Sequence, residues 1–169
     1  ELISATGHKE VVIPAVAPTY TTVGKTEGKK CSVCGTITVA QKDVAKLTLA
    51  TPVVTVKNSA TGVKVSWKAI DGATSYKVYR KTYSTKTKKY GSWKTCGTVT
   101  ATSYVDTNAK SGTKYIYTVK AFNGDVKSGI KSSSSILYLS QPTVKIANAS
   151  TGVKRVTQTN VGEGDPVVL

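Results

Sequence analysis

The sequence predicts an all-β protein, a seven-stranded β-sandwich preceded by a small β-rich module. The chain is rich in Thr, Val, Ser and Tyr and contains one Phe and no Met; Thr, Val and Tyr favour a pleated, half-buried surface. No apolar pattern at i, i+3, i+4 and i+7 persists beyond a turn or two, so no long helix is expected. Strict alternation of apolar and polar residues in several short segments predicts strands with one buried face.

The clearest strands are predicted at 62–68, 75–81 and 113–121, where every second side chain is apolar. Asp71-Gly72 lies between the first two segments and Asn123-Gly124 follows the third, and both dipeptides favour turns. Weaker strands are predicted at 53–57, 90–99, 102–105 and 130–138. Seven short strands, with one tryptophan early and a pair of tyrosines late, indicate a β-sandwich.

Residues 1–50 lack the regular alternation of the later segments. Short apolar runs at 11–13 and 37–39 alternate with Pro, Gly and Lys, which predicts two or three short strands joined by turns. A segment this short and this poor in apolar residues normally needs a staple or a neighbour in order to fold. The predicted organisation is therefore a small Cys-containing module (1–50), a sandwich domain (51–140) and the start of a second, incomplete copy or a tail (141–169).

An internal repeat supports the size of the sandwich unit. "TPVVTVKNSATGVKV" (51–65) recurs loosely as "QPTVKIANASTGVKR" (141–155), and Pro52 matches Pro142 at a spacing of 90 residues. After Arg155 the match ends. A strand without its neighbours exposes backbone donors and acceptors, so the tail is predicted to pair with an edge of its own sandwich or to add a strand to a neighbouring copy. The second alternative would mean self-association through residues 141–169.

The sandwich segment carries several features of one family: Pro52 enters the first strand, Trp67 lies in the second, Tyr76 in the third, and "SGTKYIYTVKA" covers 111–121. With these features, residues 51–140 resemble a bacterial fibronectin type III domain. The resemblance implies a sandwich of three strands on four. It also implies that Tyr115 packs into the core and closes a corner with its hydroxyl group.

Two cysteines with two residues between them occur in "CSVCG" (31–35). Together with His8, Cys31 and Cys34 would supply three of the four Cys or His ligands that a structural zinc site usually uses. A Cys31–Cys34 disulfide and a pair of reduced, merely tolerated cysteines are the alternatives. The cofactor prediction is none, or zinc at this site.

The same segment resembles, over residues 6–47, a small repeat of secreted Gram-positive surface proteins of the gut clostridial type. The pattern of that repeat runs from a His through Pro-Thr-Cys-Thr to Cys-x-x-Cys-Gly, and this chain keeps His8, "PTYT" and "CSVCG". Tyr20 stands where the repeat has its middle cysteine, and Thr6 where it often has another. The resemblance implies an extracellular location, and the change at Tyr20 removes one of the ligands that the repeat would offer.

The chain is strongly basic, with 24 Lys+Arg against 9 Asp+Glu, and its only arginines are Arg80 and Arg155. Nucleic-acid readers usually depend on arginine, so a nucleic-acid partner is not expected. The absence of a run of 18 apolar residues argues against membrane insertion. An anionic glycan or cell-wall polymer could bind a sheet face and the loop at 82–93. The candidate binding residues are Lys77, Tyr79, Lys81, Lys114, Lys120, Lys86, Lys88, Lys89 and Tyr90. An ordinary solvated face is the alternative.

No catalytic set is predicted. The sandwich acids Asp71, Asp106 and Asp125 fall in predicted turns, where Asp usually caps the backbone, and the single histidine lies in the other module. Cys96 is expected to be a free interior thiol. The sequence therefore predicts a non-catalytic segment of an extracellular bacterial protein, acting as a spacer, presentation or adhesion module whose partners are other modules of the same chain. The alternative is a carbohydrate- or polyanion-binding accessory module.

Overall fold

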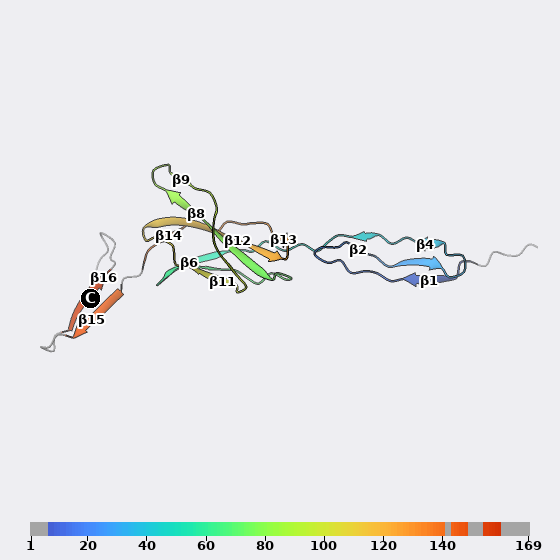
Figure 1. Ribbon diagram of the computed structural model, residues 1–169, viewed down its shortest axis with the longest axis horizontal. Coiled ribbons are helices and arrows are strands. Elements are labelled where there is room, and N and C mark those ends of the chain that lie inside the picture. Colours follow the sequence, from blue (N-terminus) through green and yellow to red (C-terminus); the bar gives the residue numbers. More distant parts are fainter. Residues whose placement is uncertain (1–6, 141–142, 149–153, 160–169) are drawn as a thin grey trace, which may run out of the picture. The chain divides into compact units, whose positions relative to one another are not determined.

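The computed structural model describes residues 7–140, 143–148 and 154–159, and all regular structure within these residues is β (Figure 1). In this described part no helix is long and apolar enough to cross a membrane. The chain divides into two compact units, Glu1–Thr48 and Leu49–Leu169.

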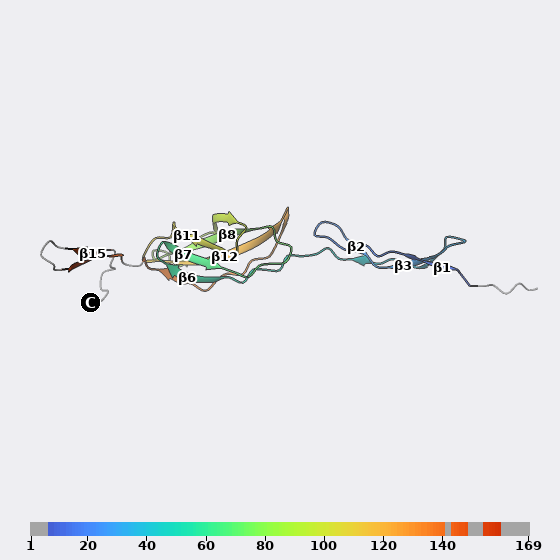
Figure 2. The same cartoon turned by 90° about the horizontal axis from the view of Figure 1, so that it is seen from below.

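The first unit is built from two small antiparallel sheets. The strands of the larger sheet, in the order β1-β3-β4, are β1 (Glu10–Ile13), β3 (Gly28–Cys31) and β4 (Ile37–Val39). The smaller sheet consists of β2 (Gly24–Lys25) and β5 (Asp43–Val44). Figure 2 shows this unit from the side as a thin ribbon of strands. A single layer gives an apolar face nothing to pack against.

The burial of the first unit reflects this single layer. Apolar side chains of its strands stay exposed, including Val12 at 56% and Ile37 at 53%. Within residues 7–48 the buried residues are Gly24, Gly28 and Cys31. Cys31 is therefore the one residue with a side chain that this part of the chain buries, at 4% exposure.

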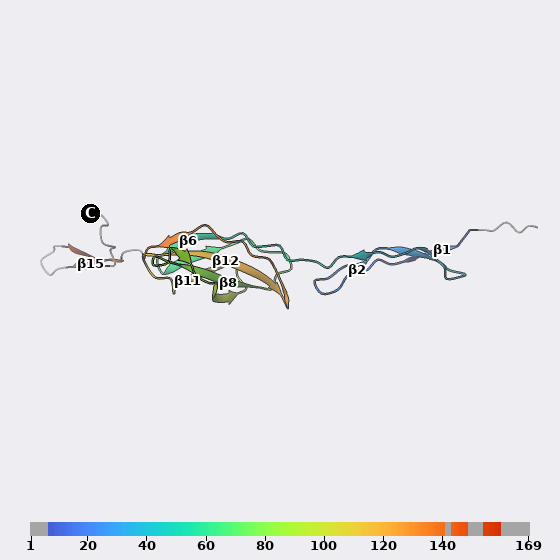
Figure 3. The same cartoon turned by 90° about the horizontal axis from the view of Figure 1, so that it is seen from above.

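The second unit contains a β-sandwich, which confirms the predicted fold class. Its smaller sheet has the order β11-β7-β6 and consists of β6 (Thr55–Ser59), β7 (Gly62–Ser66) and β11 (Ser103–Asp106). Its larger sheet has the order β10-β8-β12-β13, made of β8 (Ser75–Ser84), β10 (Lys94–Val99), β12 (Thr113–Asn123) and β13 (Val126–Lys127). Two short strands extend it: β9 (Lys89–Tyr90) pairs with β8, and β14 (Ile136–Tyr138) pairs with β12. The two layers are seen from another side in Figure 3.

The core of the sandwich comes from the alternating positions that the sequence predicted to face inward. The buried side chains of β7, β8 and β12 are Val63, Val65, Tyr76, Val78, Tyr115, Tyr117, Val119 and Ala121. Tyr115 Oη accepts a hydrogen bond of 2.9 Å from the backbone N–H of Lys110, so the corner implied by the family resemblance is present. Burial of these side chains removes the apolar face of each sheet from water, which is the main source of stability of a sandwich.

Trp67 is buried at 7% exposure, as the sequence predicted. The inward positions of the second and sixth predicted strands should face each other across the sandwich, which predicts that Trp67 packs against Tyr115 or Tyr117. The ring contact that the structure shows instead joins Trp67 and Tyr76, with centroids 5.3 Å apart. Tyr115 and Tyr117 contact one another instead, at 6.1 Å. Trp67 therefore anchors the β7–β8 side of the core.

Both predicted turn dipeptides form turns. Gly72, between β7 and β8, has φ = +74°, and Gly124, between β12 and β13, has φ = +54°. These left-handed conformations favour glycine because it has no Cβ atom to clash with the backbone. The two turns reverse the chain between β7 and β8 and between β12 and β13.

Two segments differ from the prediction. β8 continues to Ser84 and pairs with β9, so most of the expected loop at 82–93 is a β-hairpin. The expected strand at 130–138 is regular only at β14, because upstream the hydroxyl groups of Ser128 and Ser133 accept the N–H groups of Ala121 and Tyr117, at 3.0 and 2.9 Å. Serine side chains there replace the carbonyl groups of a regular ladder.

The described parts of the tail form their own hairpin. β15 (Thr143–Asn148) pairs antiparallel with β16 (Lys154–Thr159), an arrangement that the prediction did not include. Pairing of the tail with an edge of the sandwich stays a prediction. A nearby strand closes a shorter loop and costs less chain entropy than a distant sheet edge. The register also departs from the repeat, since Asn58 pairs with Val63 but Asn148 pairs with Lys154, one residue further on. Addition of a strand to a neighbouring copy stays a prediction.

Candidate functional sites

The first candidate site lies at one end of the β1–β3–β4 sheet. His8 precedes β1, Cys31 ends β3, and Cys34 lies in the turn to β4. The register that pairs Glu10 with Cys31, together with a hydrogen bond of 2.9 Å from Ser32 N–H to Lys9 O, brings His8 beside this turn. His8 Nδ1 lies 3.5 Å from Cys34 Sγ, and one ligand atom from each of the three residues lies within 4.8 Å of the others.

The backbone around Cys31 favours its thiolate. Hydrogen bonds from the backbone N–H groups of Cys34 and Val33 lower the pKa of Cys31 to about 6, because they stabilise the charged sulfur. The Val33 N–H donates to Cys31 Sγ at 3.4 Å, and Cys34 Sγ lies 3.2 Å from the hydroxyl oxygen of Thr36. A thiolate is the form of cysteine that binds metals and attacks electrophiles.

Tyr20 does not belong to this cluster. The β-bridge between Val16 and Lys25 places the turn with Tyr20 at the opposite end of the hairpin from the Glu10–Cys31 pair. Val16 lies six positions after Glu10 in the chain, which is about 20 Å of extended chain. The prediction that Tyr20 deprives this site of a ligand is therefore wrong, because a residue there could not reach Cys31. Thr6 lies outside the described residues.

The second candidate site is the outer face of the β8–β12 strand pair. Lys77 lies opposite Lys120, and Tyr79 lies opposite Thr118. Together with Trp93 and Ile130, the side chains of Tyr79, Thr118 and Lys120 line a hollow of about 110 Å³. The structure thus brings together part of the predicted lysine and tyrosine set. Trp93 and Ile130 were not among the predicted site residues, because they come from irregular segments whose position the strand pattern does not give.

Cations of this face pair with aromatic rings. Lys81 Nζ lies 4.9 Å from the centroid of the Trp93 ring, and Lys114 Nζ lies 5.6 Å from that of Tyr83. Tyr83 in turn contacts Tyr90 edge-on, with centroids 5.2 Å apart. Three further predicted lysines, Lys86, Lys88 and Lys89, are exposed at the tip of the β8–β9 hairpin. The predicted residues therefore divide into a sheet face with a hollow and a separate basic tip.

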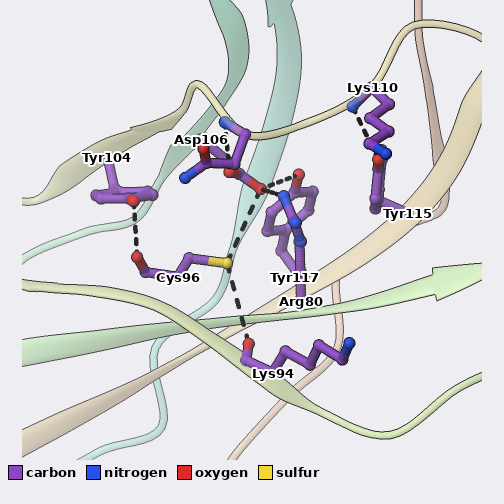
Figure 4. A network of polar contacts seen from close by, with 9 residues as sticks. Arg80, Lys94, Cys96, Tyr104, Asp106, Lys110, Tyr115 and Tyr117 are labelled. Carbon is purple, nitrogen blue, oxygen red and sulfur yellow. Dashed lines mark hydrogen bonds and ion pairs between the residues drawn. The ribbon is translucent and has the colours of Figure 1, made fainter.

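A buried polar network in the sandwich corrects the prediction for Asp106 (Figure 4). Asp106 is 1% exposed at the end of β11, and its Oδ2 lies 2.6 Å from Arg80 Nη1 and 2.9 Å from the hydroxyl of Tyr117, which donates to it. Its Oδ1 accepts the backbone N–H of Asn108 at 3.2 Å, so the expected turn cap is only part of its role. Arg80 occupies an inward position of an alternating strand, and that sequence signal could have predicted a buried acidic partner.

Cys96 joins this network through an irregularity of β10. Thr95 pairs with Tyr79 and Gly97 pairs with Val78, so Cys96 is the extra residue of a β-bulge. A bulge redirects the side chain of its extra residue, and Cys96 Sγ lies 3.9 Å from Asp106 Oδ2. Burial, reinforced by the nearby Asp106 carboxylate, raises the pKa of Cys96 to about 12. The thiol is therefore protonated and a poor nucleophile at neutral pH.

Comparison with known proteins concerns the sandwich. The family model described as "Fibronectin type III domain SaeA third domain" matches residues 52–137. Among solved structures, a Fn3-like protein from Clostridium thermocellum is 30% identical over 54% of this chain and 92% of its own, with a TM-score of 0.42. FN3tt is 20% identical over 56% of this chain and 99% of its own, with a TM-score of 0.46.

A third similar structure belongs to a larger protein. A β-1,2-glucanase from Parabacteroides distasonis is 19% identical over 65% of this chain and 17% of its own, with a TM-score of 0.42. No curated protein matches the chain. The family match spans just over half of the 169 residues and coincides with the sandwich, in which a three-stranded sheet faces a sheet of six strands, four of them on its main path, and with the Tyr115 corner. On this evidence the chain belongs to the fibronectin type III family.

Proposed function

We propose that the chain is a non-catalytic modular segment of an extracellular bacterial protein, acting as a spacer, presentation or adhesion module between other modules. Fibronectin type III domains are generally non-catalytic and are commonly spacers. The observation that carries the proposal is a network of ionisable side chains inside the sandwich. Asp106 forms an ion pair with Arg80 and accepts a hydrogen bond from the hydroxyl group of Tyr117. Groups that satisfy each other in the core stabilise the domain, which supports a structural role for these three ionisable side chains.

A binding survey at two ionic strengths tests this function. The whole chain is applied to an array of neutral, uronic-acid, sulfated and phosphorylated glycans at about 20 mM and about 150 mM salt, where the screening length falls to about 8 Å. For a spacer, the attraction of a basic protein to polyanions should disappear at the higher salt concentration. Selective, saturable binding that persists at 150 mM salt would contradict the spacer function.

A polyanion- or carbohydrate-binding accessory function is the second candidate, and the hollow on the β8–β12 face favours it. Tyr79 and Trp93 offer aromatic surfaces, and Lys120 offers a cation at the same hollow. Ligand sites commonly combine apolar walls with a few polar groups that orient the ligand. An acidic sugar unit has matching chemistry, because its C–H face can pack on a ring while its anionic group pairs with the lysine.

Two substitutions separate this function from general charge attraction. Tyr79→Ala removes an aromatic wall without changing the net charge, so a specific site should lose affinity for the acidic glycan at 150 mM salt. Tyr90→Ala removes a ring of β9 that does not line the hollow; it is the matched control and should have little effect. Equal losses in both variants, or no loss in either, would contradict a site at the hollow.

A further inference from the structure

The strands of the first unit bury too little side-chain surface to explain its stability. Its sheets are single layers, its apolar side chains are largely exposed, and Cys31 is the one side chain that is buried within residues 7–48. Two- and three-stranded sheets without a covered hydrophobic face are marginal in water. Domains of this size usually depend on a metal or on disulfides for stability.

The cluster at the end of the β1–β3–β4 sheet has the chemistry and the spacing of a zinc site. Zinc prefers Cys sulfur and His nitrogen, with bonds of about 2.3 and 2.0–2.1 Å in tetrahedral geometry. Those bond lengths place a sulfur and a nitrogen ligand about 3.6 Å apart and two sulfurs about 3.8 Å apart. His8 Nδ1 and Cys34 Sγ are 3.5 Å apart, and all three ligand atoms lie within 4.8 Å of one another.

The surroundings also suit a thiolate ligand. The Val33 N–H points at Cys31 Sγ at 3.4 Å, which is the type of hydrogen bond that neutralises charge on metal-bound sulfur. The hollow next to the cluster is lined by Gly7, Lys9 and Val33 as well as by the three candidate ligands. Its opening leaves room for a fourth ligand from solvent.

We propose that His8, Cys31 and Cys34 bind one Zn²⁺ ion, and that this ion holds the first unit together. His8 precedes β1, Cys31 ends β3 and Cys34 precedes β4, so the ion would connect all three strands of the sheet at one end. The fourth position is open to water or to a ligand atom of another molecule. The site stabilises the unit because metal binding to ligands that only the folded chain assembles is linked to folding.

Cobalt spectroscopy on the whole chain tests the proposal. The chain is first fully reduced, then titrated anaerobically with Co²⁺ and finally with Zn²⁺. A tetrahedral thiolate site should show thiolate-to-cobalt charge transfer and intense d–d absorption that saturate at one equivalent and vanish when Zn²⁺ displaces the cobalt. A reduced chain that shows none of this absorption would overturn the proposal.

Variants identify the ligands. His8→Gln and Cys34→Ser should each weaken Zn²⁺ binding by more than the roughly 10–100-fold cost of removing a hydrogen-bond partner behind a ligand. Cys96→Ala, which removes the third thiol of the chain, should bind cobalt like the original protein. Unchanged binding in His8→Gln would overturn the three-ligand site, as would loss of binding in Cys96→Ala.

Hydrogen exchange measures the structural role directly. Zn²⁺ should increase the protection of backbone amides in β1, β3 and β4 and leave those in the core strands β7 and β12 unchanged. Binding without any gain of protection in the first unit would contradict the stabilising role of the ion.

Discussion

Asp106 links several polar groups in the core of the sandwich. It accepts from Arg80, from Tyr117 and from the backbone of Asn108, and it lies beside the thiol of Cys96. Burial, reinforced by the Asp106 charge, also raises the pKa of Tyr117 well above its usual range. A buried carboxylate is tolerated only when charge and hydrogen bonds compensate its desolvation. The partners of Asp106 provide this compensation, so the stability of the sandwich should depend on them.

Asp106→Ala should lower the free energy of unfolding by about 3 kcal/mol. The change leaves Arg80 without its anion and Tyr117 without its acceptor, but the Arg80 side chain is 21% exposed and water can compensate part of the loss. Chemical denaturation of the whole chain measures the effect. Asp125→Ala, at an exposed turn position, is the control and should change stability by less than about 0.5 kcal/mol. Equal effects of both substitutions would refute the role of the network.

Trp67→Ala should cost on the order of 3–5 kcal/mol, because it removes a large buried side chain and its contact with Tyr76. Trp93→Ala is the matched control, since Trp93 is half-buried on the outer face of the larger sheet. We expect the control to lose about 1 kcal/mol. Thermal and urea unfolding give both values, and a Trp67→Ala loss no larger than that of the control would contradict the core assignment.

Cys96 should resist alkylation in the folded protein. With a pKa raised from 9.0 to about 12, its thiolate fraction at pH 8 is roughly 1,000-fold smaller than that of an ordinary thiol. Iodoacetamide labelling followed by mass spectrometry should therefore modify the exposed Cys34 first and Cys96 only after unfolding. Rapid labelling of Cys96 in the native chain would contradict its protonated, half-buried state.

The same raised pKa sets a pH dependence of stability. The unfolded chain releases the Cys96 proton near pH 9, whereas the folded chain retains it until about pH 12. The stabilising contribution is therefore complete below pH 9 and is lost as the pH rises from about 9 to about 12. Cys96→Ala should flatten this alkaline decline in a series of denaturation curves.

At the scale of elements, strand pairing places like charges opposite one another on both sheets. Lys77 faces Lys120 on β8 and β12, and Lys57 faces Lys64 on β6 and β7. Like charges directly opposite each other on neighbouring strands destabilise the sheet. The two faces differ in their aromatic side chains, because only the β8–β12 face carries the hollow with Tyr79 and Trp93.

Lys120→Glu should therefore change stability and binding in opposite directions. The substitution converts repulsion with Lys77 into attraction and should stabilise the sandwich by about 0.2–1 kcal/mol. If the β8–β12 face binds polyanions, the same substitution should weaken binding to heparin and reduce its dependence on salt. Lys64→Glu makes the same change of charge on the other sheet and should gain similar stability. Equal loss of heparin binding in both variants would contradict a site on the β8–β12 face.

At the scale of the whole molecule, the two units differ in the source of their stability. The second unit buries alternating side chains of two sheets, whereas the first unit buries little besides Cys31. The tail adds a two-stranded hairpin, β15–β16, whose described strands pair with one another. A two-stranded hairpin is marginally stable by itself, and the outer edge of a strand can pair with another chain, which is the physical reason to test the tail for self-association.

Deletion of residues 141–169 tests the role of the tail. β15 and β16 already form backbone hydrogen bonds with each other along one edge of each strand. We therefore expect the whole chain and the deletion variant to have the mass of a monomer by light scattering. The sandwich should also unfold at a similar denaturant concentration in both proteins. A dimer or larger species that disappears on deletion would show that the tail joins copies of the chain.

The local pattern of the sequence was sufficient for much of the fold. Period-two alternation places Val63, Val65 and Tyr117 on inward faces because successive side chains of a strand point to opposite sides of the sheet. Gly72 and Gly124 lie in turns for the equally local reason that they adopt left-handed backbone conformations. The sandwich and its core strands could therefore be predicted without knowledge of which strands pair.

Interactions between distant segments were decided only by the tertiary structure. The bulge that points Cys96 toward Asp106 depends on the register between β8 and β10. The pairing of Asp106 with Arg80 depends on the register between β7 and β11 and on the packing of the two sheets. Likewise, the composition offers His8, Cys31 and Cys34 as ligands, but the β1–β3 register brings them together and places Tyr20 at the other end. Alternation is a property of each strand alone, whereas register and the compensation of buried charge are properties of strands that meet only in the folded chain.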